Sequence, residues 1–202
     1  MKPYADAPRL PDSKEVDLRD VVRGAFYEIE LGPGRGGFIV ERAAAEPTAA
    51  LVGLEIRRKW ASIVDAKLKK LGHGERARVF AEDARVALPR IVPDASVRRF
   101  FAHFPDPWWK KRHQKRLMLA PLLLDHVARL LERGGELFVQ TDVEERAAEL
   151  ESQLAGDTRF APNGDAPDSP RISDHPYVAR SPRERRAMAD GLPIFRMRWR
   201  RV

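Results

Sequence analysis

FYEIELGPGRGGF, residues 26–38, joins a short apolar run to a turn that contains four glycines. The run at 26–31 predicts a strand, and the residues after the turn predict a helix that continues to about Ala45. A glycine-rich turn between a strand and a helix lets the backbone approach a nucleotide-like ligand closely. A tight turn that binds no ligand has the same composition. The residues at the ends of the other strands must therefore distinguish a ligand-binding turn from a purely structural one.

The rest of the chain continues this alternation of strands and helices. Further strands are predicted at 51–56, 77–81, 97–101, 136–140 and 194–199, and helices at 59–71, 116–131 and 143–154. The stretch 156–174 is rich in Pro, Gly, Asp and Ser and predicts a loop. Alternating strands and helices indicate a parallel sheet covered on both faces. We therefore expect a doubly wound α/β fold that binds its ligands at the carboxyl ends of the strands.

Length and composition limit the architecture and the chemistry. The 202 residues predict a flexible N-terminal segment at 1–20 and a single domain at 21–202. The absence of cysteine excludes disulfides, thiolate zinc sites and cysteine nucleophiles. The chain has no signal-peptide core and no apolar run near the ~20 residues of a membrane span, so we expect a cytoplasmic protein without a membrane partner.

Positive charge is in excess and is clustered. The 37 basic and 30 acidic residues give a net charge of +7. Such an excess favours a polyanionic partner, although a merely solubilising surface has the same net charge. The basic residues gather in blocks at 110–116, 180–186 and 196–201. This clustering is more informative than the net charge.

Acidic residues lie at the ends of three successive predicted strands. Glu30 precedes the glycines, Glu55 closes the second strand, and Asp83 follows the third. Glu55 is suited to accept both hydroxyl hydrogens of a ribose, and Asp83 to accept a hydrogen bond from an adenine amino group. Glu30 would repel the pyrophosphate of a dinucleotide but attract the positive charges of S-adenosylmethionine. Ordinary solvated carboxylates are the alternative, and the placement of these acids favours S-adenosylmethionine.

FPDPWWKKRH, residues 104–113, directly follows the fourth predicted strand. Two prolines flank Asp106 and restrict the direction of its side chain. Trp108 and Trp109 offer flat faces on which a base can stack, and the cations after them suit RNA phosphates. A rigid loop with a solvated charge run is the alternative. The combination of acid, aromatic rings and cations favours an RNA site.

These stretches together resemble the bacterial tRNA (guanine-N7-)-methyltransferases, a class I S-adenosylmethionine-dependent family. The resemblance runs from about Tyr27 to Trp199. Its most specific part is the FPDPWxKKRHxKR-like run at 104–116, supported by EIELGPGRGGF at 28–38, VGLEIR at 52–57 and QTD at 140–142. The resemblance implies a mostly parallel, seven-stranded, Rossmann-like sheet with an antiparallel last strand. It also implies S-adenosyl-L-methionine as the cofactor and tRNA as the partner.

The resemblance implies roles for individual positions, and the charge pattern adds the phosphate contacts. Cofactor binding is expected from Glu30, Gly32, Gly34, Glu55, Asp83 and Asp106, and Asp106 is also the expected catalytic residue. Substrate binding is expected from Lys110, Asp142, Ser181 and Glu184, and phosphate contacts from Lys111, Arg112, Lys115 and Arg116. Ser181 and Glu184 match a late Thr-x-Phe-Glu motif of the family, in which Arg183 here replaces the phenylalanine.

Guanine N7 has a free lone pair, so its methylation needs no prior deprotonation and leaves a cationic ring. Alignment of donor and acceptor can supply up to ~7–11 kcal/mol in favourable intramolecular cases. We expect Asp106 to stabilise the positive charge, and Asp142 to bind the N1 and amino hydrogens of guanine. The implied target is the variable-loop guanine at tRNA position 46. The sequence shows no cluster of metal ligands, so no metal is expected.

Other classes of function stay open from the sequence. A class I methyltransferase that acts on a small molecule or a protein would use the same strand-end acids, but it would leave the basic block after Asp106 unexplained. A non-catalytic RNA-binding module would not bind the cofactor. A dinucleotide oxidoreductase is disfavoured by Glu30. The sequence is compatible with a monomer and with a homodimer.

The expected role of Asp106 gives a first prediction. Asp106→Asn should abolish turnover and largely preserve tRNA affinity, because the amide keeps the shape of the side chain but cannot stabilise a cation. Turnover measured with saturating cofactor, beside a tRNA binding assay, checks this. Normal turnover by the variant would exclude the proposed role.

Overall fold

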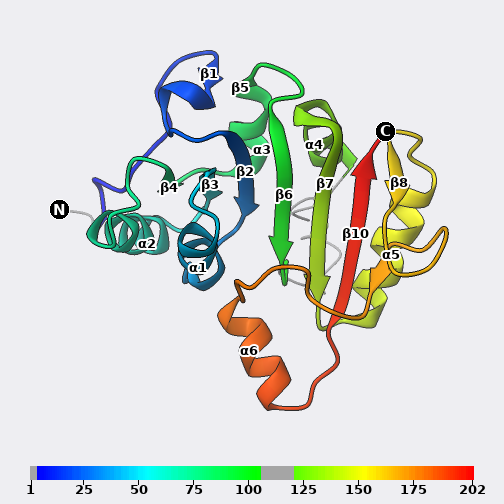
Figure 1. Ribbon diagram of the computed structural model, residues 1–202. Coiled ribbons are helices and arrows are strands. Elements are labelled where there is room, and N and C mark those ends of the chain that lie inside the picture. Colours follow the sequence, from blue (N-terminus) through cyan, green and yellow to red (C-terminus); the bar gives the residue numbers. More distant parts are fainter. Residues whose placement is uncertain (1–3, 106–120) are drawn as a thin grey trace.

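One large sheet forms the centre of the computed structural model, which describes residues 4–105 and 121–202 (Figure 1). Its strands are β2 (Phe26–Leu31), β3 (Ala49–Leu54), β4 (Ala77–Phe80), β6 (Val97–His103), β7 (Leu131–Thr141), β8 (Phe160–Pro162), β9 (Arg171–Ile172) and β10 (Phe195–Arg201). The order across the sheet is β4-β3-β2-β6-β7-β10-β8, and β9 also pairs with β10. The neighbouring strands β4, β3, β2, β6 and β7 are parallel, whereas β10 is antiparallel to β7. The predicted mostly parallel α/β sheet with an antiparallel last strand is confirmed, and β9 is an addition to the expected seven strands.

Helices cover both faces of the sheet, as the sequence predicts. They are α1 (Gly37–Ala45), α2 (Arg58–Lys70), α3 (Ala84–Ala87), α4 (Pro121–Leu130), α5 (Glu144–Ala155) and α6 (Pro182–Ala189). The alternation of side chains along a strand separates the two layers. In β3, Leu51 joins the apolar cluster that includes α1 and α2, whereas Val52 joins the cluster that includes α4 and α5. β3 is therefore buried on both sides, which explains its continuous apolar sequence.

Short elements attach the N-terminal segment to the domain. Strand β1 (Val16–Asp17) pairs in parallel with β5 (Ile91–Val92), and the 3-10 helices η1 (Leu18–Asp20) and η2 (Leu88–Arg90) lie beside them in sequence. Leu10, Val16 and Leu18 are buried in the main core. The flexibility of residues 1–20 stays a prediction, and these side chains anchor the part that the structure describes. Among the described helices, none combines the length and the apolar character needed to span a bilayer.

The C-terminal third differs from the sequence-based prediction. The stretch 156–174, predicted to be a loop, contains β8 and β9, and this prediction is wrong at those strands. Both are short and gain their hydrogen-bond partners from β10, which follows later in the chain. A local composition rich in turn residues does not reveal such a partner. Helix α6 was not predicted either.

Buried charges tie strand β2 to its neighbours. Glu28 in β2 is fully buried, and its carboxylate accepts hydrogen bonds from Arg42 Nε and Nη2, both at 2.8 Å. Arg99 Nη1 of β6 donates to the same carboxylate at 2.8 Å. Both guanidinium groups lie over the ring of Tyr177, at 5.1 Å and 5.9 Å from its centroid. The network thus joins α1, β2 and β6 to the segment that precedes α6.

This network predicts a large stability effect. Arg42→Met should lower the free energy of unfolding by about 3 kcal/mol, because it removes the bidentate partner of a fully buried carboxylate. Arg19→Met is the control, since the pair of Arg19 with Asp17 is exposed and should change stability by less than about 1 kcal/mol. Urea unfolding of both variants checks this. Equal, small losses would show that the buried pair contributes no more than the exposed one.

Candidate active site

The glycine turn after β2 has a backbone that other residues would not adopt easily. Gly32, Gly34 and Gly36 all have positive φ angles, of 67°, 55° and 71°. A Cβ atom on Gly36 would lie 2.2 Å from Cγ1 of Val64 in α2, so the turn is also packed too closely for a side chain. The turn therefore brings bare backbone to the carboxyl end of β2. This is the geometry expected for close approach to a nucleotide-like ligand.

The strand-end acids lie along one edge of the sheet. β2, β3 and β4 are neighbouring parallel strands, with Leu31 paired to Leu54 and Leu54 paired to Phe80. Glu30 is one residue before the end of β2, and Glu55 directly follows β3. Asp83 lies three residues beyond the end of β4. The structure thus brings the predicted cofactor residues to adjacent strand ends.

Glu55 is held by the loop that it faces. The buried carboxylate accepts a hydrogen bond from the Gly34 N–H at 2.8 Å through Oε2. Its Oε1 accepts from the backbone N–H and from Nε of Arg57, at 2.9 Å and 3.0 Å. The orientation of the Glu55 side chain and the shape of the glycine turn therefore depend on each other. Each oxygen of a carboxylate has two acceptor positions, so Oε2 keeps capacity for a further donor.

Asp83 occupies the N-cap of α3. Its carboxylate accepts hydrogen bonds from the backbone N–H of Arg85 at 3.0 Å and from Arg85 Nε at 2.9 Å. The hydrogen bond from the Arg85 side chain is the largest cause that lowers the pKa of Asp83. Asp83 is thus an anion at neutral pH, and its two oxygens act only as hydrogen-bond acceptors.

Glu30 has a partner that the sequence reasoning missed. The side chains of Glu30 and His103 are each only 4% exposed, and His103 Nδ1 lies 3.0 Å from Glu30 Oε1. Glu30 Oε2 is buried and has no hydrogen-bond partner among the described residues. His103 ends β6 and directly precedes the FPDP run. This position at a strand end could have identified His103 as a site residue from the sequence. The next residue, Phe104, has a φ of 49° and donates its N–H to the Gln140 carbonyl at 2.7 Å.

Asp142 and helix α6, which Ser181 caps, come together beyond the carboxyl end of β7. Helix α6 lies beyond this end of the sheet (Figure 1). Ser181 is its N-cap and accepts a hydrogen bond from the Glu184 N–H at 3.1 Å. Asp142 directly follows β7, and its Oδ2 accepts from Arg183 Nε at 3.0 Å. The arginine that departs from the family motif therefore pairs with a predicted substrate residue.

Glu184 lies inside the protein and not on the surface of the site. Its side chain is fully buried and accepts hydrogen bonds from Gln140 Nε2 at 3.2 Å and Arg196 Nη2 at 3.1 Å. His175 Nε2 lies 3.5 Å from Oε2 of the same Glu184 carboxylate. Burial, together with the charge of Arg180, lowers the pKa of His175 to about 3, so this histidine is neutral. Glu184 thus anchors α6 to β7 and β10, and direct substrate contact by Glu184 stays a prediction.

Several predicted site residues lie outside the described part of the chain. They are Asp106, Lys110, Lys111, Arg112, Lys115 and Arg116. The candidate site is therefore built from the strand ends and α6. Among the described residues, no group of three or more His, Cys, Asp or Glu side chains is placed to hold a metal ion.

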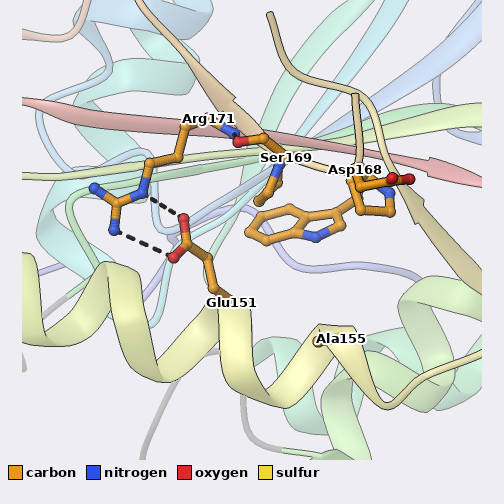
Figure 2. Close-up of a pocket in the computed structure, with 8 residues that line it drawn as sticks. Glu151, Ala155, Asp168, Ser169 and Arg171 are labelled. Atoms are coloured by element: carbon orange, nitrogen blue, oxygen red, sulfur yellow. Dashed lines mark hydrogen bonds and ion pairs between the residues drawn. The ribbon is translucent and has the colours of Figure 1, made fainter. Parts of the chain in front are cut away.

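One cavity in the described structure lies away from these residues. A cavity of about 310 Å³ opens between α5 and the connection from β8 to β9, where Glu151 pairs with Arg171 (Figure 2). Its lining comes from α5, the β8–β9 connection and β10, and includes Ser169 and Asp168. None of the strand-end acids lines it. We place the candidate site at the carboxyl ends of β2, β3, β4 and β7.

Known proteins are similar to this chain in sequence and in fold. Residues 25–197 match a family model described as "Putative methyltransferase". A tRNA (guanine-N(7)-)-methyltransferase from Anaeromyxobacter dehalogenans is 39% identical over 87% of this chain and 85% of its own length. One from Myxococcus xanthus is 33% identical over 85% of this chain and 81% of its own length.

A solved structure supports the same fold. The 16S rRNA methyltransferase KamB superposes with a TM-score of 0.64 at 15% identity, and the match covers 92% of this chain and 91% of that one. At this identity the likeness concerns the fold alone. The family model and the relatives extend over most of the chain and confirm the resemblance seen in the sequence. The chain therefore belongs to the S-adenosylmethionine-dependent tRNA (guanine-N(7)-)-methyltransferase family.

Proposed function

We propose that this protein transfers a methyl group from S-adenosylmethionine to N7 of a guanine in tRNA, with the variable-loop position 46 as the target. The observation that carries the proposal is the row of acids Glu30, Glu55 and Asp83 at the ends of the neighbouring strands β2, β3 and β4, beside the glycine turn. The names of the relatives supply the substrate. A cytoplasmic location, and a monomer or homodimer as the working form, are part of the same proposal.

The described residues fit the cofactor. Within the described part of the chain, Glu30 Oε2 is a buried acceptor without a partner, which suits the ammonium of the methionine portion. Glu55 would hold the ribose hydroxyls, Asp83 the adenine amino group, and the backbone at Gly32 and Gly34 would border the ligand. S-adenosylmethionine, when bound, supplies an electrophilic methyl group on a positively charged sulfur.

The protein side of the reaction is alignment and charge stabilisation. N7 of guanine carries its own lone pair, so no side chain has to remove a proton before attack. Asp142 would accept the N1 and amino hydrogens of guanine, which adenine cannot supply in the same pattern. Asp106 would lie near the purine as its ring becomes cationic, and a carboxylate there stabilises the transition state more than the neutral ground state.

The cations of α6 extend the site toward the RNA backbone. Arg183, Arg185 and Arg186 are each more than half exposed, and each pairs with an acid: Asp142, Glu41 and Asp190 respectively. Exposed pairs of this kind are worth about 0–1 kcal/mol, so phosphates can replace the acids at little cost. With the block at 110–116, α6 would neutralise phosphates and release counterions.

Direct methylation of tRNA tests the proposed function. Incubation of unmodified tRNA with the protein and S-adenosylmethionine should produce 7-methylguanosine, and nucleotide-resolution mapping should place it at position 46. Parallel reactions with a protein extract and with small-molecule extracts should stay unlabelled. Label in those extracts, with none in tRNA, would favour a different class I methyltransferase. Failure to bind S-adenosylhomocysteine would favour a non-catalytic RNA-binding module.

The Arg183–Asp142 pair predicts an effect on substrate affinity. Arg183→Ala and Arg186→Ala each remove one exposed cation from α6, but only the first frees Asp142 for guanine. The KM for tRNA of Arg183→Ala should therefore be lower than that of Arg186→Ala, by up to about fivefold, the equivalent of about 1 kcal/mol. Steady-state kinetics at 150 mM salt, a concentration chosen near the physiological value, checks this. A higher KM for Arg183→Ala would mean that Arg183 assists the substrate and does not compete with it.

A further inference from the structure

Most of the buried side-chain atoms that lack a partner in the described residues belong to one cluster. This cluster lies at the carboxyl ends of β2, β6 and β7 and against the chain around α6. Its unpartnered atoms are Glu30 Oε2, His103 Nε2, Gln140 Oε1, His175 Nε2 and Arg196 Nε. Buried polar atoms normally have partners, so a cluster of unpartnered ones at strand ends indicates a place where a ligand or ordered water completes the hydrogen bonds.

We propose that His103 is a positioning residue that orients the Glu30 carboxylate toward the ammonium group of S-adenosylmethionine. The inference rests on the proposed function and deepens it. His103 Nδ1 lies 3.0 Å from Glu30 Oε1, and both side chains are only 4% exposed. A carboxylate oxygen can only accept, so the hydrogen bond requires an N–H on Nδ1 that donates to it. The carboxylate then has its direction fixed, and among the described residues Oε2 has no partner and can accept from the ammonium.

Aromatic packing holds the histidine ring in place. The ring centroid of His103 lies 4.1 Å from that of Phe38 in α1. On its other sides, Phe101 and His175 stack nearly parallel to it, at 5.9 Å and 6.4 Å with interplanar angles of 10° and 13°. A ring enclosed in this way cannot turn without displacing its neighbours. Nδ1 therefore stays aimed at Glu30 before any ligand binds.

The neighbouring acid on the same strand shows what a purely structural carboxylate looks like. Glu28 is two residues before Glu30, and both of its oxygens accept hydrogen bonds from arginines. Glu30 is also buried, but among the described residues one of its oxygens is hydrogen-bonded and the other has no partner. A buried carboxylate that is only half satisfied is costly unless a cation or donor arrives. An ammonium group supplies both the positive charge and the N–H donors.

A comparison of two ligands tests this role directly. S-adenosylhomocysteine carries the amino-acid portion with its ammonium, whereas 5′-methylthioadenosine has the same nucleoside and thioether without it. Binding of each is measured by calorimetry to the wild-type protein, to His103→Phe and to His103→Asn. His103→Phe should weaken S-adenosylhomocysteine about tenfold or more and change methylthioadenosine less than twofold, since a hydrogen bond to a charged group is worth roughly 1.5–3 kcal/mol. His103→Asn keeps an N–H donor and should restore most of the lost affinity.

His126→Phe is the matched control, because His126 lies in α4, on the opposite face of the sheet, and should alter neither affinity. Thermal unfolding of every variant confirms that it is folded, and if His103→Phe does not fold, His103→Leu, which also lacks an N–H donor, takes its place. Equal weakening of both ligands, or unchanged binding of S-adenosylhomocysteine by His103→Phe, would overturn the role of His103 alone. A wild-type protein that binds neither ligand would overturn the proposed function itself.

Discussion

Two buried carboxylates on strand β2, Glu28 and Glu30, set the constraint on which this structure depends. A buried negative charge is tolerated only where cations or donors surround it. Arg42 of α1 and Arg99 of β6 compensate Glu28, and in doing so they fix the helix and the strand on either side of β2. One hydrogen bond from His103 leaves Glu30 incompletely compensated. The same strand thus carries an acid used for stability and an acid available to a cation.

The segment that leads into α6 depends on these charges as well. Tyr177 packs under the guanidinium groups that hold Glu28, and burial together with the nearby Glu136 raises the pKa of Tyr177, so it stays a phenol. Farther along, Glu184 gathers Gln140 of β7 and Arg196 of β10 and holds α6 at the sheet edge. Buried, well-paired charges position the helix, whereas its exposed arginines have weak pairs that an RNA phosphate can replace. The same short helix is therefore held in place by buried charges and carries exposed arginines whose acidic partners a phosphate can replace.

Local sequence was informative where local chemistry determines structure. The glycine turn was predicted because only glycine adopts positive φ readily and leaves room against Val64, and α1 ends at Ala45, as expected. The strands β4 and β6 begin at their predicted residues, Ala77 and Val97. By contrast, β8 and β9 fell in a stretch predicted to be a loop, because their hydrogen-bond partner β10 lies more than twenty residues away in sequence.

By itself, the sequence determined the α/β fold, the glycine turn and the acids at the strand ends. Side-chain periodicity, backbone preference and position after a strand are properties of short segments, and they can be read without a partner. Only the tertiary structure decided which of those acids are satisfied within the protein. Arg183 lies forty-one residues from Asp142, and His103 seventy-three from Glu30. Contacts between residues so far apart depend on how the strands align in the sheet, and no local pattern encodes that alignment.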